Sequence, residues 1–169
     1  IRYGYSKSCT EGRLFSKTTS LQSLPREIRH TISKDIYDDI DISNAHPVLL
    51  HSYCVKKEIP CIFLQDWVIN RDDHMKRLGV LTGLTRDDIK TEMCKILNGG
   101  LLMSELAQDS WIVSLNDELK NVRNKVIGLE PNFYRRTRGQ EFNREGKTLN
   151  LLMCKLENEV LQTMINFCR

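Results

Sequence analysis

The sequence of 169 residues predicts a helix-rich α+β fold, and three observations support this class. Residues 1–26 are rich in Ser, Thr and Gly, which is typical of loops and short strands. Apolar and acidic residues partly alternate over 36–42, as in a short strand that ends at Asp41. After residue 45, apolar residues recur at helical spacing between helix caps and stops. With 40% hydrophobic and 28% charged residues, the composition is that of an ordinary globular protein.

The first helices are predicted from apolar spacing and from one proline. A helical pattern begins at Ala45, and Pro47 would lie in its first turn, where proline is tolerated. A second helix is expected over 60–74. Residues 78–84, which contain two glycines, are expected to form a connecting turn.

The later helices carry clearer end signals. Thr85 is a good N-cap, acidic residues fill the following turn, and Asn98-Gly99-Gly100 is a typical helix stop. These signals predict a helix over 85–98. A long helix at 109–127, a basic loop and a last helix from about residue 147 complete the chain.

Composition also excludes several classes of protein. No apolar run approaches the ~18 residues of a membrane span, and no charged-then-apolar leader is present. We therefore expect a soluble, intracellular protein without a membrane partner, and we interpret the chain as a piece of a longer protein. The six cysteines lack the C-x-x-C spacing of zinc sites. Reduced thiols are the simplest interpretation, with Cys94 and Cys154 acting as small apolar side chains in helices.

Positive charge gathers in one stretch of the chain. The net charge is only +3, which does not by itself indicate a nucleic-acid partner. Between Arg135 and Lys147, however, five cations face two anions. Taken alone, this pattern favours a solvated loop. The alternative is a surface that follows phosphate groups.

A second candidate is a stripe of residues spaced by four on the helix over 85–98. Arg86, Lys90, Cys94 and Asn98 would share one helical face, because each step of four drifts by only about 40°. Two cations one turn apart repel each other unless an anion lies between them or both are solvated. A solvated edge is the default for such a pair, and a triphosphate is the functional alternative.

The acidic residue at the end of the predicted strand is a third candidate. Asp41 precedes a predicted helix, where a carboxylate can hold Mg²⁺ or can cap the helix. His46 follows five residues later and has no second histidine at the spacing of a helical metal pair. A zinc hydrolase is therefore not predicted.

Three motifs, taken in order, resemble the polymerase module of family A DNA polymerases, the group of bacterial DNA polymerase I. Thr10-Glu11-Gly12-Arg13-Leu14, followed by Leu21-Gln22-Ser23-Leu24-Pro25 and Ile28-Arg29, is similar to the segment TxGRLS…LQNIP…IR. Asp41-Ile42-Ser43-Asn44-Ala45-His46 lies where the family has DYSQIE. Arg86-x3-Lys90-x7-Asn98-Gly99 matches the spacing of RxxxKxxxFxxxYG.

The resemblance implies a template-directed DNA polymerase with two magnesium ions. Such an enzyme transfers a nucleotide to a primer 3′-OH, and the two Mg²⁺ ions steady the attacking and leaving oxygens. By resemblance, Asp41 is the catalytic metal ligand, and the carbonyl of Ile42 assists it. The second metal-binding carboxylate of the family is expected beyond Arg169, so the chain alone should be an inactive fragment.

The same resemblance assigns binding roles to the other motif residues. Arg86 and Lys90 would clamp a deoxynucleoside triphosphate, with Cys94, Asn98 and His46 also in the nucleotide site. His46 replaces the usual glutamate, and Cys94 and Asn98 replace two aromatic residues of the family. Arg13 and Gln22 would contact the primed DNA template.

The resemblance also suggests an organisation of the chain. Residues 1–58 would form the first part of the palm with a small antiparallel sheet, 59–130 the helical fingers, and 131–169 the basic loop and the returning palm helix. The details are most similar to the divergent polymerases of virophages, giant-virus-associated elements and large DNA transposons. In that group the polymerase is often joined to a helicase, so a fused or associated helicase is an expected partner.

Two other functions stay open at the level of sequence. The first is a polymerase-like module that binds nucleic acid without catalysis. The second is a helical interaction domain in which the motifs occur by coincidence.

Overall fold

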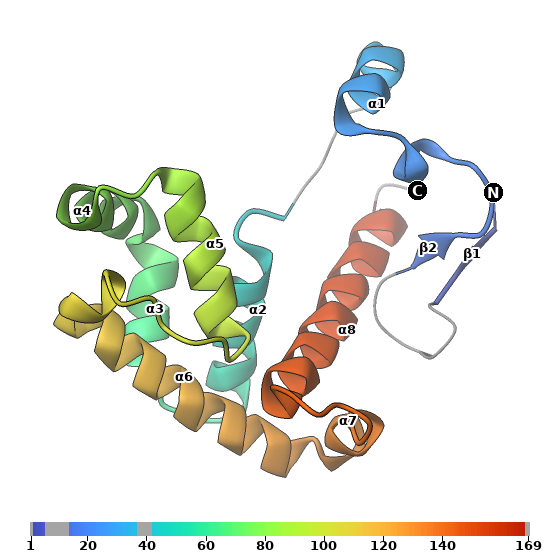
Figure 1. Cartoon of the computed structure of the whole chain (residues 1–169). Coiled ribbons are helices and arrows are strands. Elements are labelled where there is room, and N and C mark those ends of the chain that lie inside the picture. Colours follow the sequence, from blue (N-terminus) through green and yellow to red (C-terminus); the bar gives the residue numbers. More distant parts are fainter. Residues whose placement is uncertain (1, 6–13, 37–41, 168–169) are drawn as a thin grey trace. The chain divides into compact units, whose positions relative to one another are not determined.

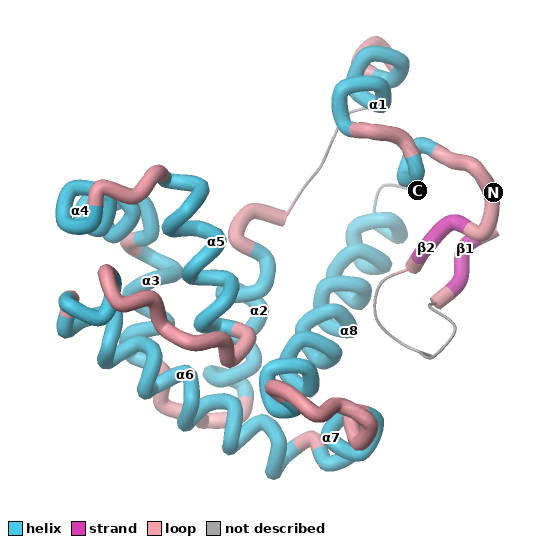
Figure 2. Tube along the Cα trace, in the orientation of Figure 1, coloured by secondary structure: helices cyan, strands magenta, loops and turns pink. Residues whose placement is uncertain are grey.

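The computed structural model describes residues 2–5, 14–36 and 42–167, which fall into two compact units (Figure 1). The first unit comprises Ile1–Ala45 and Cys154–Arg169, and the second comprises His46–Met153. Helices predominate in the part described, and the strands form a single small sheet (Figure 2). The predicted helix-rich α+β class is therefore confirmed. The predicted division into palm and fingers stays a prediction.

The first unit contains the sheet and two short helical elements. Strands β1 (Tyr3–Gly4) and β2 (Phe15–Ser16) pair antiparallel, with Tyr3 opposite Ser16. The 3-10 helix η1 (Leu21–Ser23) and helix α1 (Arg26–Ser33) follow. Of the strand predicted over 36–42, residues 37–41 lie outside the described residues.

The second unit is built from consecutive helices. Their bounds are α2 (Ala45–Lys56), α3 (Ile62–Ile69), α4 (Arg71–Thr82), α5 (Arg86–Leu97), the 3-10 helix η2 (Leu106–Gln108), α6 (Ser110–Leu129), α7 (Pro131–Arg136) and α8 (Arg144–Phe167). Residues 154–167 of α8 belong to the first unit. In the described part of the chain, no helix combines the length and the apolar character needed to cross a membrane.

Helix α6 forms the centre of the core of the second unit. Its apolar residues at helical spacing, from Ile112 through Leu119 to Val126, are buried. Helices α3, α5 and α7 pack against α6, and α4 packs against α3 and α5. Each fully buried Leu or Ile side chain contributes roughly 1.5–3 kcal/mol of burial free energy, so this stripe organises the unit.

The structure confirms most of the predicted helices and corrects three segments. Pro47 lies in the first turn of α2, Thr85 caps α5, and Asp109 caps α6. The single helix predicted over 60–74 is wrong, because α3 ends at Ile69 and α4 starts at Arg71.

Two further segments differ because tertiary contacts favour helix. The turn predicted over 78–84 is largely the last part of α4, which ends at Thr82 and is followed by Gly83 with a φ of 72°. The basic loop after residue 130 is partly helical as α7, and α8 starts three residues before the predicted position.

Candidate functional site

The five cations between residues 135 and 147 are the main candidate site, and we call them the basic corner. They are Arg135, Arg136, Arg138, Arg144 and Lys147. The whole chain has 25 Lys and Arg against 22 Asp and Glu, and residues 135–147 hold five of these cations and two of the carboxylates. The other 156 residues therefore balance at 20 of each sign. This stretch therefore carries a local net charge of +3, and residues 1–34 carry seven cations against two carboxylates.

The fold fixes the basic corner where α7 meets the start of α8. Arg144 lies over the ring of Tyr134, with 3.6 Å between its guanidinium carbon and the ring centroid, and donates a hydrogen bond to the Tyr134 carbonyl at 2.8 Å. The hydroxyls of Thr137 and Thr148 meet at 3.0 Å in the interior. These contacts tie α7 to the first turn of α8, so the cations on both helices belong to one structured surface.

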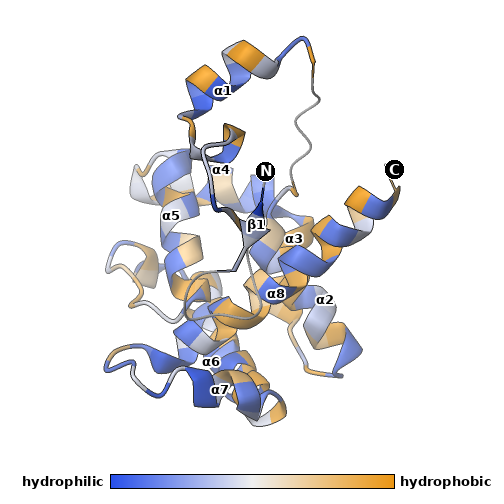
Figure 3. Ribbon diagram, turned by 90° about the vertical axis from the view of Figure 1, so that its right-hand side faces the viewer, coloured by the Kyte–Doolittle hydropathy of each residue, from blue (hydrophilic) through white to orange (hydrophobic). Residues whose placement is uncertain are grey.

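Most of the basic corner is accessible. Arg144 is half-buried by its stacking, and the other four cations are exposed. Within residues 2–5, 14–36 and 42–167, Arg138 and Lys147 form no ion pair with a carboxylate. In Figure 3, hydrophilic segments of α7 lie next to hydrophobic ones. This surface can therefore accept an anionic partner.

Asparagine side chains lock the start of α8 onto the end of α5. Asn143, with a φ of 46°, donates to the Asn98 carbonyl at 2.6 Å and accepts from the Gly146 N–H at 3.1 Å. Asn150 also donates to the Asn98 side chain, at 3.4 Å. Gly146 lies so close to Asn98 that a Cβ atom would overlap its carbonyl oxygen. This junction holds the basic corner in a fixed place on the second unit.

A buried arginine caps the same end of α5. Arg123 on α6 is 5% exposed and donates to the carbonyl oxygen of Ile96 at 3.0 Å. Burial lowers the pKa of Arg123, and the nearby Glu145 carboxylate opposes that shift. Sequence reasoning missed this role, because Arg123 lies 27 positions from its acceptor and its place in the helical pattern is typical of a solvated cation.

The structure places the predicted stripe on one exposed face of α5. Arg86, Lys90 and Cys94 are exposed and Asn98 is half-buried, so the four-residue spacing correctly predicts a shared face. Cys94 lies in a helix as expected, and its thiol is exposed on α5. Cys54 and Cys61 are buried thiols.

Two residues of the stripe already have partners within the protein. Arg86 pairs with Asp72 on α4 at 2.6 Å, and this contact lowers the pKa of Asp72. Asn98 donates to the Cys94 carbonyl at 2.8 Å and takes part in the α5–α8 junction. The nucleotide-binding roles of the stripe stay a prediction, which would require Arg86 to exchange its carboxylate partner for phosphate.

The remaining predicted site residues are only partly described. Arg13 and Asp41 lie outside the described residues. Ile42 and His46 are half-buried, and the Gln22 amide is engaged with β2, where it accepts from Ser16 N–H at 2.8 Å and donates to the Leu14 carbonyl at 3.0 Å. The magnesium site and the primer contacts therefore stay predictions.

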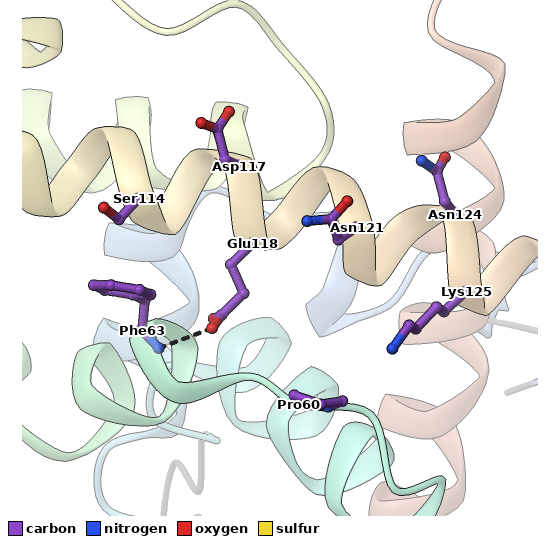
Figure 4. A pocket seen from close by; sticks show the side chains of 8 residues that line it. All are labelled: Pro60, Phe63, Ser114, Asp117, Glu118, Asn121, Asn124 and Lys125. Carbon is purple, nitrogen blue, oxygen red and sulfur yellow. Dashed lines mark hydrogen bonds between the residues drawn. The ribbon is translucent and has the colours of Figure 1, made fainter.

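A pocket of about 710 Å³ lies between the start of α3 and α6 (Figure 4). Its floor is the Glu118 carboxylate, which accepts hydrogen bonds from the backbone N–H groups of Phe63 at 3.1 Å and Leu64 at 2.8 Å. These N–H groups start α3 and would otherwise attract an anion. Because Glu118 occupies them, and Asp117 adds a second carboxylate, the pocket does not suit phosphate.

An aromatic and charged cluster joins α3, α4 and the start of α6. Asp66 accepts from Trp111 Nε1 at 2.8 Å and from His74 Nε2 at 2.9 Å, and the His74 ring stacks on Trp111 at 3.8 Å. Arg77 donates to Asp109, which also accepts from the Ile112 N–H at 3.0 Å. Every polar group in this cluster has a partner inside it, so its role is structural.

This cluster predicts a loss of stability in acid. The Asn70 hydrogen bond, assisted by those from His74 and Trp111, lowers the pKa of Asp66 below 3.8 despite burial. Burial raises the pKa of Asp109, but the Arg77 and backbone hydrogen bonds outweigh this effect and hold it below 3.8. As the pH falls, both carboxylates bind protons in the unfolded state before they do so in the folded state. Their contribution to the free energy of unfolding is therefore complete above about pH 5 and is lost as the pH drops through the folded pKa values.

Urea unfolding measured from pH 5 to pH 2 checks this expectation. The Asp109→Asn variant keeps a helix-capping side chain but does not titrate at position 109. Its free energy of unfolding should fall less than that of the parent over this range, because the side chain at position 109 no longer takes up a proton on unfolding. Identical pH profiles for the two proteins would contradict the role of Asp109.

Comparisons with known proteins give one informative similarity. The chain is 28% identical over 180 residues to a Sputnik virophage protein named "Putative helicase V13". The match covers 99% of this chain but 23% of the virophage protein, so the chain spans about a quarter of the length of this relative. No protein-family model matches the chain, and no solved structure matches it.

This similarity corrects the function expected from the motifs. A template-directed DNA polymerase was predicted, whereas the relative is named as a helicase and not as a polymerase. The predicted polymerase activity is therefore contradicted. The resemblance of the three motifs to family A polymerases stays a prediction, because no comparison tests it.

Proposed function

We propose that this chain is a nucleic-acid-binding part of a larger, helicase-type enzyme. The observation that carries this proposal is the basic corner, which gathers five cations and two carboxylates within 13 residues on one structured surface. The similarity along almost the full chain to a virophage protein named as a helicase supports nucleic acid as the polyanion that this surface meets. The proposed binding is directed to phosphates and is independent of sequence.

The geometry suits a backbone contact better than a small anion site. The cations come from α7, the following turn and the first turn of α8, so they spread over a surface instead of converging on one point. Arg144 is held in place by Tyr134, whereas Arg138 and Lys147 keep their charges available. An extended polyanion can contact several such cations at once, and each contact releases condensed counterions.

The proposal concerns binding, and it assigns no ATP-driven motor to this chain. Gly146-Lys147-Thr148 matches the end of the phosphate-binding loop G-x-x-x-x-G-K-[ST], but Glu141 stands where the first glycine is required. Thr148 is fully buried and bonded to Thr137, so its hydroxyl is not available to a magnesium-bound nucleotide. Thr148 instead joins α8 to the residue that follows α7, and Gly146 packs against the end of α5.

Replacement of Arg138 and Lys147, which form no ion pair with a carboxylate of the described residues, tests the proposal. Anisotropy of a labelled single strand of about 20 nucleotides should show micromolar binding by the parent chain. Its logarithmic salt slope between about 50 and 200 mM salt should be about −3, because each contacted phosphate of a single strand contributes about −0.7. In the Arg138→Ala/Lys147→Ala variant, the slope should become shallower by about 1.4 and the affinity should fall about tenfold.

A matched variant separates this surface from general positive charge. Lys56→Ala/Lys76→Ala removes two exposed cations from α2 and α4, and it should leave at least the larger part of the affinity and slope intact. Equal losses in the two double variants would contradict the basic corner as the binding surface. Absence of binding by the parent chain would contradict the proposed function itself.

A further inference from the structure

An exposed aromatic side chain lies within the basic corner. Phe142 is 86% exposed, which is far more than its apolar ring favours in water. Arg144 follows it by two positions and Lys147 by five, while Arg138 precedes it by four. An apolar ring among cations that face solvent has no folding role in the second unit.

The backbone holds this ring at a defined place. On one side, the Gln140 N–H donates to the Thr137 carbonyl at 3.0 Å. On the other side, Asn143 is fixed by its bonds to Asn98 and Gly146, and its carbonyl accepts from the Lys147 N–H at 3.0 Å. Residues 141 and 142 thus project from two anchored ends, so little backbone order would be lost when the ring meets a ligand.

We propose that Phe142 stacks on an unpaired base of a single-stranded nucleic acid whose backbone contacts the basic corner. Cations along a strand combined with an exposed ring are the two elements by which proteins hold single strands without reading sequence. A base pair inside a duplex offers no free face to a ring on the surface. The inference rests on the proposed function and deepens it, because it names the unpaired strand as the preferred form.

The test compares the Phe142→Ala variant with the parent chain on single-stranded and duplex DNA of equal length. We expect the affinity for the single strand to fall about tenfold, as for the loss of one aromatic stack, while the duplex affinity changes less than about twofold. The salt slope should not change, because no charge is removed. Oligo-dT and oligo-U arms then show whether the strand is DNA or RNA.

Further variants separate ring stacking from other effects. Phe142→Trp should keep the affinity, and its added indole fluorescence should be quenched when the single strand binds. Phe142→Leu keeps an apolar side chain without a ring and should behave like Phe142→Ala. Phe167 is 90% exposed on α8, so Phe167→Ala is the matched control and should leave binding unchanged.

Two outcomes would overturn this inference without affecting the proposed function. The first is a Phe142→Ala variant that binds the single strand as tightly as the parent, which would leave the basic corner as a purely electrostatic surface. The second is an equal loss on single strand and duplex, which would exclude a preference for unpaired bases. Failure of the parent chain to bind either form would instead contradict the proposed function.

Discussion

Replacement of Gly146 by alanine should lower the free energy of unfolding by about 3 kcal/mol, although alanine is normally the better helix former. A Cβ at this position would overlap the backbone carbonyl oxygen of Asn98 and would lie 2.5 Å from Asn143 Oδ1. Neither atom can move easily. The Asn98 carbonyl accepts a hydrogen bond from the Asn143 side chain, and the Asn143 side-chain oxygen caps α8 by accepting from the Gly146 N–H. Urea unfolding followed by far-ultraviolet circular dichroism measures the change.

Gly128 provides the matched control for this experiment. It also lies in a helix, but a Cβ there would have open space around it. Gly128→Ala should therefore stabilise the protein by about 0.5–1 kcal/mol. If both variants changed the stability in the same direction and by similar amounts, the close approach of α5 and α8 described here would be wrong.

Truncation of Arg123 should cost about 3 kcal/mol. Arg123→Ala removes the buried stem of the side chain and its guanidinium hydrogen bond to the Ile96 carbonyl, which then keeps only backbone donors such as the Gly99 N–H. Arg123→Met keeps most of the apolar part of the side chain but has no hydrogen-bond donor. It should therefore lower the free energy of unfolding by less, about 1–2 kcal/mol. The difference between the two variants measures packing separately from hydrogen bonding.

An exposed cation on the same helix serves as the comparison. Lys120 pairs with Asp117 at 2.9 Å at the surface, and Lys120→Ala should change the stability by less than about 0.5 kcal/mol. If Arg123→Ala also changed the free energy of unfolding by less than about 0.5 kcal/mol, Arg123 would not be the cap of α5. The same unfolding experiment covers all three variants.

Local signals were sufficient to predict the helices that have strong ends. Thr85 and Asp88 form a reciprocal capping box, and Gly99 adopts a φ of 78° at the stop that follows α5. These features depend on residues within one turn, so the sequence displays them directly. The same local spacing correctly placed the residues of the α5 stripe on one face.

The break between α3 and α4 was missed although the sequence contains a signal for it. Asn70 is followed by acidic residues in the first turn of α4, which is a common helix start. The apolar pattern that runs through this region led instead to the prediction of a single helix over 60–74. The Asn70 side chain bonds to Asp66 at 2.7 Å and thereby closes α3.

Gly79 was misread for a different reason. In an isolated segment it indicates a turn, but in the fold it lies inside α4, where a Cβ would make only ordinary contacts with Leu84 and Ile89. Contacts between residues distant in sequence decided the candidate site. Arg123, Asn143 and Gly146 each contact the C-terminal end of α5 or Asn98 after it, 26 or more positions away, and no periodicity reports such pairs.

The concentration of five cations within 13 residues has a kinetic consequence. These charges create a local positive potential at the basic corner, which extends beyond the range of single contacts. At low ionic strength this potential attracts a polyanion before any specific contact forms, and it favours encounters at this surface. At physiological ionic strength this attraction reaches only about 8 Å, and the association rate should therefore decrease with added salt more steeply than the dissociation rate increases.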